Sequence, residues 1–88
     1  MPRTLTMQRT IIPAADRRKY IERLPQRRAY YEKAGCKFWV FEEIELAGAY
    51  IEFIEAANSD TLTEALERST DKSGPVDPSR IYQEVELK

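Results

Sequence analysis

The fold of this chain is decided by residues 36–56, which read CKFWVFEEIELAGAYIEFIEA. Two segments of this stretch, 36–43 and 49–56, are rich in aromatic and β-branched residues, a composition that favours strands. The residues between them are few enough to form the turn of a hairpin. The sequence therefore predicts two antiparallel strands joined by a short connection.

The hydrophobic pattern of the hairpin predicts its register. Pairing Phe38 with Phe53 makes one face wholly apolar, and a slip by one residue would scatter that face. The predicted apolar face comprises Phe38, Val40, Ala49, Ile51 and Phe53, and the other face holds Lys37, Trp39, Phe41, Tyr50, Glu52 and Ile54.

Strand and helix patterns precede the hairpin. Residues 5–12 alternate in hydropathy and predict a strand. A helix is predicted from about 15 to 34, with Asp16 as a candidate cap, a break near Pro25 and Gly35 as the residue that ends it.

A second helix and a final strand are predicted after the hairpin. Leu62, Ala65 and Leu66 have the spacing of a short amphipathic helix, preceded by the cap candidates Asn58, Ser59 and Asp60. Residues 69–79 read as a flexible loop, and 81–87 alternate like a half-buried strand. The order β-α-β-β-α-β predicts a single α+β domain over residues 1–88. It is ferredoxin-like, an antiparallel sheet with two helices on one face.

Composition narrows the class of protein. The 88 residues are 42% hydrophobic and 33% charged, which excludes a disordered chain and a disulfide scaffold. No histidine is present, so imidazole bases and histidine-bound metal or haem are excluded, and no metal or cofactor is predicted. The single cysteine, Cys36, is predicted to be a buried apolar residue in a cytoplasmic protein. No membrane span or signal peptide is evident.

Charge is unevenly divided along the chain. Residues 1–33 hold nine Lys/Arg and three Asp/Glu, whereas residues 34–88 hold five and twelve. Such asymmetry fits either a basic patch for an anionic partner or two halves that neutralise each other in the fold or across a dimer. We favour the second interpretation.

The face predicted to point away from the helices raises a separate problem. In a monomer it would expose Trp39, Phe41, Tyr50 and Ile54 together, an apolar patch that monomers seldom tolerate. A second copy of the same sheet would cover it. The sequence therefore predicts a homodimer that closes into an α+β barrel.

Three segments carry a resemblance to a known group of proteins. The run 34–41, AGCKFWVF, the strand 49–56, AYIEFIEA, and the helix 60–66, DTLTEAL, resemble the dimeric α+β barrel superfamily. That group includes proteins similar to antibiotic-biosynthesis monooxygenases and to stress-responsive barrel proteins. The resemblance implies a homodimer that binds or converts a small aromatic or polyketide-like compound without a cofactor.

Candidate ligand-binding residues lie on the predicted second face. Trp39, Phe41 and Tyr50 could line a pocket for a flat aromatic ligand, with Glu52 as its polar group. The alternative is a dimer core in which Glu52 pairs with an arginine. An unpaired carboxylate among aromatic rings would have a raised pKa and could act as an acid or base.

Further candidates lie in the predicted first helix. Arg27 and Arg28 are considered together: Arg28 continues the stripe of Tyr20, Ile21 and Leu24, and an arginine there could bind a carboxylate or phosphate. The alternative is that Pro25 resets the helical phase and both arginines face solvent. The phenol of Tyr31 could bind a ligand or could simply cover the core.

Three functional classes follow. The first is a small-molecule-binding protein of the barrel type, and whether it is an enzyme stays open. The second is a non-catalytic dimerisation module. The third is an RNA-binding domain, which shares the β-α-β-β-α-β order. We do not favour nucleic acid as a partner, because Glu52, Glu84 and Glu86 would repel phosphates.

Overall fold

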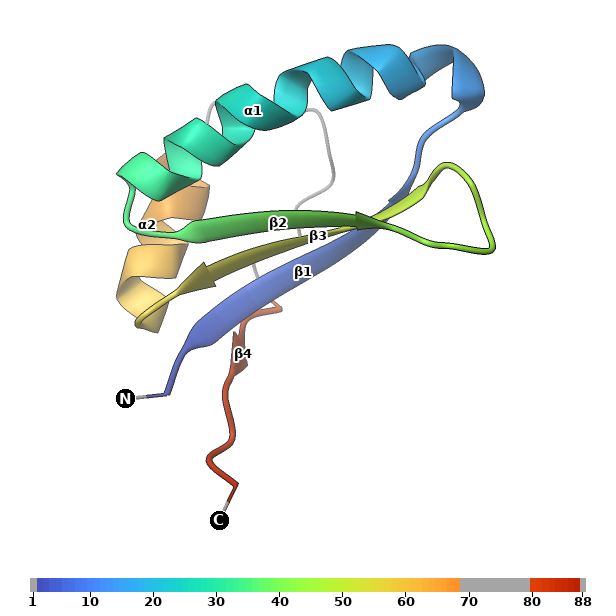
Figure 1. Ribbon diagram of the computed structural model, residues 1–88. Coiled ribbons are helices and arrows are strands. Elements are labelled where there is room, and N and C mark those ends of the chain that lie inside the picture. The colour runs from blue at the N-terminus through green and yellow to red at the C-terminus, as the bar shows by residue number, and fades with distance from the viewer. Residues whose placement is uncertain (1, 69–79, 88) are drawn as a thin grey trace.

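The chain folds into one antiparallel sheet covered by two helices (Figure 1), in a computed structural model that describes residues 2–68 and 80–87. The elements are β1 (Thr4–Ile11), a short 3₁₀ helix (Ala14–Asp16), α1 (Arg17–Lys33), β2 (Lys37–Glu42), β3 (Ala49–Ala56), α2 (Ser59–Arg68) and β4 (Tyr82–Gln83).

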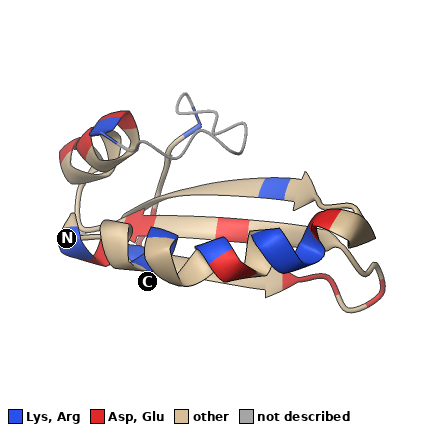
Figure 2. Cartoon of the chain, turned by 90° about the horizontal axis from the view of Figure 1, so that it is seen from above, with Lys and Arg blue, Asp and Glu red and all other residues tan. Residues whose placement is uncertain are grey.

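The four strands lie in the order β2-β3-β1-β4, and all three pairings are antiparallel. The predicted α+β class, with a four-stranded antiparallel sheet and two helices, is confirmed and is compatible with a ferredoxin-like fold. Viewed from above, α1 lies over one half of the sheet and α2 lies beyond one end of it (Figure 2).

Three local predictions need correction. The break near Pro25 is wrong, because α1 runs unbroken through this residue, which removes one backbone N–H but leaves the neighbouring turns bonded. Asp16 stands at the N-cap, but its side chain makes no capping hydrogen bond. The last strand is only Tyr82–Gln83, since pairing to β1 stops there. The predicted loop at 69–79 lies outside the described residues.

Two predicted helix ends are confirmed. Gly35 follows α1 with φ 87°, the left-handed conformation that favours glycine. Asn58 caps α2, where its Oδ1 accepts a hydrogen bond from the Thr61 N–H at 2.8 Å.

The predicted register of the hairpin is wrong by one residue. Phe38 pairs with Ile54 rather than with Phe53, and Trp39 pairs with Phe53. The turn sets this register: the Glu43 N–H donates to the Ala49 carbonyl at 2.9 Å, so the loop is one residue longer than predicted. The hydrophobic pattern could not detect the slip, because both faces of the hairpin carry large apolar side chains.

The corrected register gives the sheet two different faces. On the helix-facing side, the core of Phe38, Ile54 and Ala56 packs against Tyr31 of α1 and Leu62 of α2. Cys36 is buried in this core as predicted, and burial raises the pKa of its thiol.

We call the other side of the sheet the open face, because neither helix covers it. Its cross-strand rows follow from the pairing register and alternate strand faces. The first row is Tyr82, Leu5, Glu55 and Lys37, the second is Met7, Phe53 and Trp39, and the third is Arg9, Ile51 and Phe41. Ile11, at the end of β1, belongs to the same face.

Gly48 is the tightest point of the turn. It has φ 91°, its carbonyl accepts a hydrogen bond from the Ile12 N–H at 2.8 Å, and its own N–H donates to Glu42 Oε2 at 3.0 Å. That hydrogen bond, with burial opposing it and Arg17 assisting it, lowers the pKa of the Glu42 carboxyl. A side chain at residue 48 would meet backbone, since an added Cβ lies 2.8 Å from the Ile12 carbonyl oxygen.

We therefore expect Gly48→Ala to destabilise the fold more than Gly35→Ala. Both variants place a side chain in the left-handed region, at about 1–2 kcal/mol each. A Cβ at residue 35 meets only the Thr61 methyl group at 3.6 Å, an ordinary contact, whereas residue 48 adds a clash with backbone. Urea unfolding of both variants measures the difference. Equal losses of stability would contradict this account of the turn.

Candidate functional site

Glu52 is a buried carboxylate in the middle of the helix-facing side of the sheet. Only 6% of the residue is exposed. Arg27 Nη1 and Nη2 donate to its two carboxylate oxygens at 2.9 and 2.7 Å, and the Tyr20 hydroxyl donates to Oε2 at 2.6 Å. Both carboxylate oxygens are therefore engaged by donors of the same chain, as a buried charge requires.

One stripe of α1 supplies both partners of Glu52. Tyr20, Leu24, Arg27 and Tyr31 follow each other at intervals of four, three and four, so they share the face that α1 turns to the sheet. Arg27 occupies a position in this stripe that an apolar residue would otherwise fill. Its guanidinium carbon lies 5.1 Å from the centre of the Phe38 ring, a cation–π contact.

The phenol of Tyr20 is held in its protonated form. Burial is the largest cause that raises its pKa, followed by the hydrogen bond to Glu52 and the nearby negative charge. Its ring packs against Tyr50, with centroids 4.7 Å apart. Tyr20 is therefore a hydrogen-bond donor to Glu52 rather than a base, and Glu52 with both oxygens occupied acts as a structural anion.

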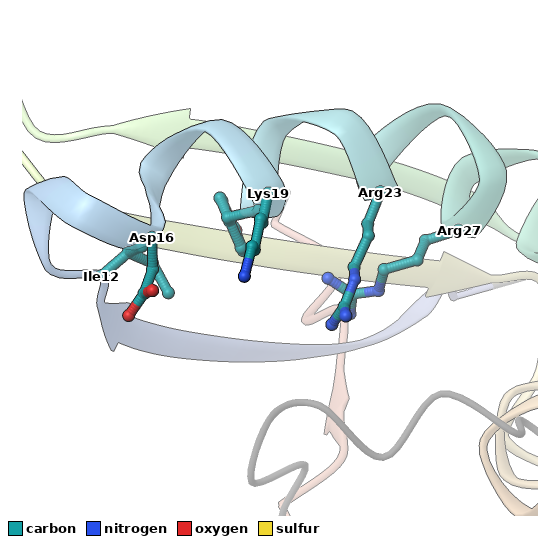
Figure 3. Close-up of a pocket in the computed structure, with 6 residues that line it drawn as sticks. Ile12, Asp16, Lys19, Arg23 and Arg27 are labelled. Carbon is teal, nitrogen blue, oxygen red and sulfur yellow. The ribbon is translucent and has the colours of Figure 1, made fainter.

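A cavity of about 280 Å³ lies beside this cluster, next to α1 (Figure 3). Lys19, Arg23 and Arg27 recur every fourth residue along α1, and their side chains point into the same opening. Asp16 lies at the opposite end of this row from Arg27 (Figure 3). The lining residues are Ile12, Asp16, Lys19, Tyr20, Arg23 and Arg27.

The structure divides the predicted ligand-binding residues between two places. Trp39, Phe41 and Arg28 line one groove of about 440 Å³ along β2, the edge strand of the sheet. Tyr50 and Glu52 lie on the helix-facing side with the core. The prediction that all four residues of the hairpin share one face is therefore wrong, because the register differs by one residue.

Two more predicted residues can now be placed. Arg28 is exposed and pairs with Glu32 at 3.7 Å, so it faces solvent, which is the alternative that the sequence left open, although α1 runs unbroken through Pro25. Tyr31 is 2% exposed and stacks on Phe38, with ring centroids 5.5 Å apart. Tyr31 thus covers the core, which is the alternative that the sequence left open.

Sequence reasoning named Arg27 as a candidate beside Arg28 but did not place it in the inward stripe, and it missed Lys19 and Arg23. The helical spacing did contain information about Arg27. On a helix, residue 27 lies closer than residue 28 to the face shared by Tyr20, Leu24 and Tyr31. The prediction that Glu52 could pair with an arginine is confirmed, although the partner belongs to the same chain and lies on the helix-facing side.

Residues 2–68 and 80–87 offer no clustered metal ligands. No group of three or more His, Cys, Asp or Glu side chains there is placed to hold a metal ion. None of the helices in that part of the chain is long and apolar enough to cross a membrane.

Comparisons with known proteins do not identify a relative. No family model, curated protein or solved structure matches this chain. The candidate sites therefore rest on their own geometry.

We expect the Arg27–Glu52 pair to be essential for stability. Replacing one partner leaves the other charge buried without compensation, at a typical cost of about 3–5 kcal/mol. Arg27→Met and Glu52→Gln should each lower the free energy of unfolding strongly, and the double variant should lose less than the sum. Chemical unfolding of the four proteins of this cycle gives the coupling energy.

The neighbouring arginine provides the control. The Arg28 side chain is 63% exposed, so Arg28→Met should change the free energy of unfolding by less than about 0.5 kcal/mol. If both arginine substitutions changed the free energy of unfolding equally, the buried Arg27–Glu52 pair would not stabilise the fold more than an exposed arginine does.

Proposed function

We propose that this chain works as a homodimer in which two sheets pair through their open faces, in the manner of a dimeric α+β barrel. The observation that carries the proposal is the apolar character of the open face. Its exposed fractions are 42% for Trp39, 55% for Phe41, 47% for Met7 and 57% for Ile11. Apolar patches of this kind seldom remain uncovered in monomers.

The packing within the open face supports a flat interface. Phe41 and Phe53 meet edge to face with centroids 5.8 Å apart, and Met7 and Trp39 flank Phe53 in the same row. Large side chains on neighbouring strands therefore already form a continuous apolar layer. A second layer of the same composition would add burial worth roughly 1.5–3 kcal/mol for each large side chain.

The charges at the ends of the open face support a second copy as the occupant. Arg3 pairs with Glu55 and Glu84, each at 3.2 Å, and Arg9 pairs with Glu43 at 3.4 Å. Arg3, Arg9 and their acidic partners are compensated within the chain, so an identical face could approach without burying them unpaired, and Lys37 is exposed on the edge strand β2. A strongly charged partner would gain little from such a face.

The groove along β2 supports a second candidate, the binding of a small aromatic compound. Its walls are Ile21, Leu24 and Pro25 of α1 and the aromatic side chains of β2, and Arg28 is its charged residue. Apolar walls with one polar group are typical of small-molecule sites. A dimer without ligand, acting only as an assembly module, is the alternative.

The dimer is tested by light scattering after size exclusion. We expect a mass of two chains at micromolar concentration, and Trp39→Glu should give a folded monomer because it places a charge in the interface. Ile44→Glu is the matched control, since Ile44 is 99% exposed in the turn and lies outside the open face.

Two outcomes decide the dimer proposal. If Trp39→Glu loses its circular dichroism signal, Met7→Lys on β1 repeats the test from another strand. A wild-type monomer, or a dimer unaffected by folded variants of the open face, would contradict the proposal.

The groove is tested by the fluorescence of Trp39, the chain's single tryptophan. We expect 2-naphthol to quench this emission in a saturable way, corrected against free tryptophan, and Arg28→Gln to weaken the response. Arg18→Gln is the control, because Arg18 lies on α1 outside the groove. Quenching that does not saturate, or equal responses of the two variants, would contradict ligand binding in the groove. The dimer would then act only as an assembly module.

A further inference from the structure

The cavity beside β1 has an unusual surrounding for a space between a helix and a sheet. The residues of β1 that share the face of Glu52 are Thr4, Thr6, Gln8 and Thr10, whereas the apolar residues of β1 lie on the open face. A surface beneath a helix is normally the apolar one. Because α1 packs on β2 rather than on β1, it does not cover this polar face of β1.

Lys19, Arg23 and Arg27 on α1 give this cavity a positive charge. The positive charge of Arg27 is compensated by Glu52 at 2.7 Å. Within the described part of the chain, by contrast, Lys19 and Arg23 take part in no ion pair. Arg23 and Arg27 line the same cavity, and Figure 3 shows both side chains turned toward its opening, so an anion bound there would be attracted by the uncompensated charge of Arg23.

We propose that this cavity binds a small organic carboxylate. Arg23 and Lys19 would hold the carboxylate, and the ring of Tyr20 with the side chain of Ile12 would contact the apolar part of the ligand. The volume of about 280 Å³ is small for a ligand pocket and suits a compound of about one ring.

The distribution of charge along the cavity determines how the carboxylate ligand would lie. Asp16 would repel a carboxylate at its own end of the cavity, so the charged group of the ligand belongs at the Arg23 end and its apolar part nearer Ile12 (Figure 3). The site lies on the opposite side of the sheet from the open face. It is therefore separate from the proposed dimer interface, and it shares no lining residue with the groove along β2.

The test compares benzoate with its neutral analogue benzamide, using amide chemical shifts of the isotope-labelled full chain. We expect benzoate to bind saturably, with shifts centred on residues 12–27, and benzamide to bind at least about tenfold more weakly. Arg23→Gln should weaken benzoate at least about tenfold. Arg18→Gln, an arginine of the same helix whose side chain is 90% exposed and lies outside this cavity and the groove along β2, should leave benzoate binding unchanged.

Several results would overturn the proposed carboxylate site. No saturation by benzoate up to about 10 mM, equal binding of benzamide, or equal effects of the two arginine variants would overturn the proposal. Inorganic phosphate is the third probe: saturable binding of phosphate without benzoate would also overturn it, in favour of a phosphate site. If Arg23→Gln does not fold, Lys19→Gln is measured in its place.

Discussion

The burial of Glu52 is the constraint on which the arrangement of this chain depends. β3 has neighbours on both sides, so a carboxylate in its centre has no route to solvent at the sheet edge. Its charge is tolerated because Arg27 meets both oxygens and Tyr20 adds a third hydrogen bond. The position of α1 over the sheet therefore satisfies an electrostatic requirement as well as a hydrophobic one.

This requirement has consequences for both sides of the sheet. Since Glu52 faces α1, its neighbours Ile51 and Phe53 must face the other way, beside Trp39 and Phe41. The helix-facing side keeps a modest apolar core near α2 and becomes polar toward β1. The open face receives a large share of the apolar side chains that a monomer would bury. The burial of one carboxylate thus goes together with an apolar open face and with a helix-facing side whose polar part lies on β1.

Some features of the fold could be predicted from the sequence and others could not, as individual residues show. The strand 49–56 has the bounds that its composition predicts, and Gly35 ends α1 where its conformational freedom is needed. The register of the hairpin was not predictable from hydropathy, because Phe38 and Val40 on one face are matched by Trp39 and Phe41 on the other. A turn longer by one residue decides between them, and its hydrogen bonds have no marked signal in the sequence.

The sequence by itself determined the order of strands and helices, the α+β class and the excess of positive charge in the first 33 residues. These are local properties, set by periodicity, capping residues and composition. Only the tertiary structure decided that Arg27 rather than Arg28 turns inward to Glu52, and that Lys19 and Arg23 line a cavity next to α1. The physical reason is that a buried charge selects its partner across the sheet, and local patterns carry no information about distance in space.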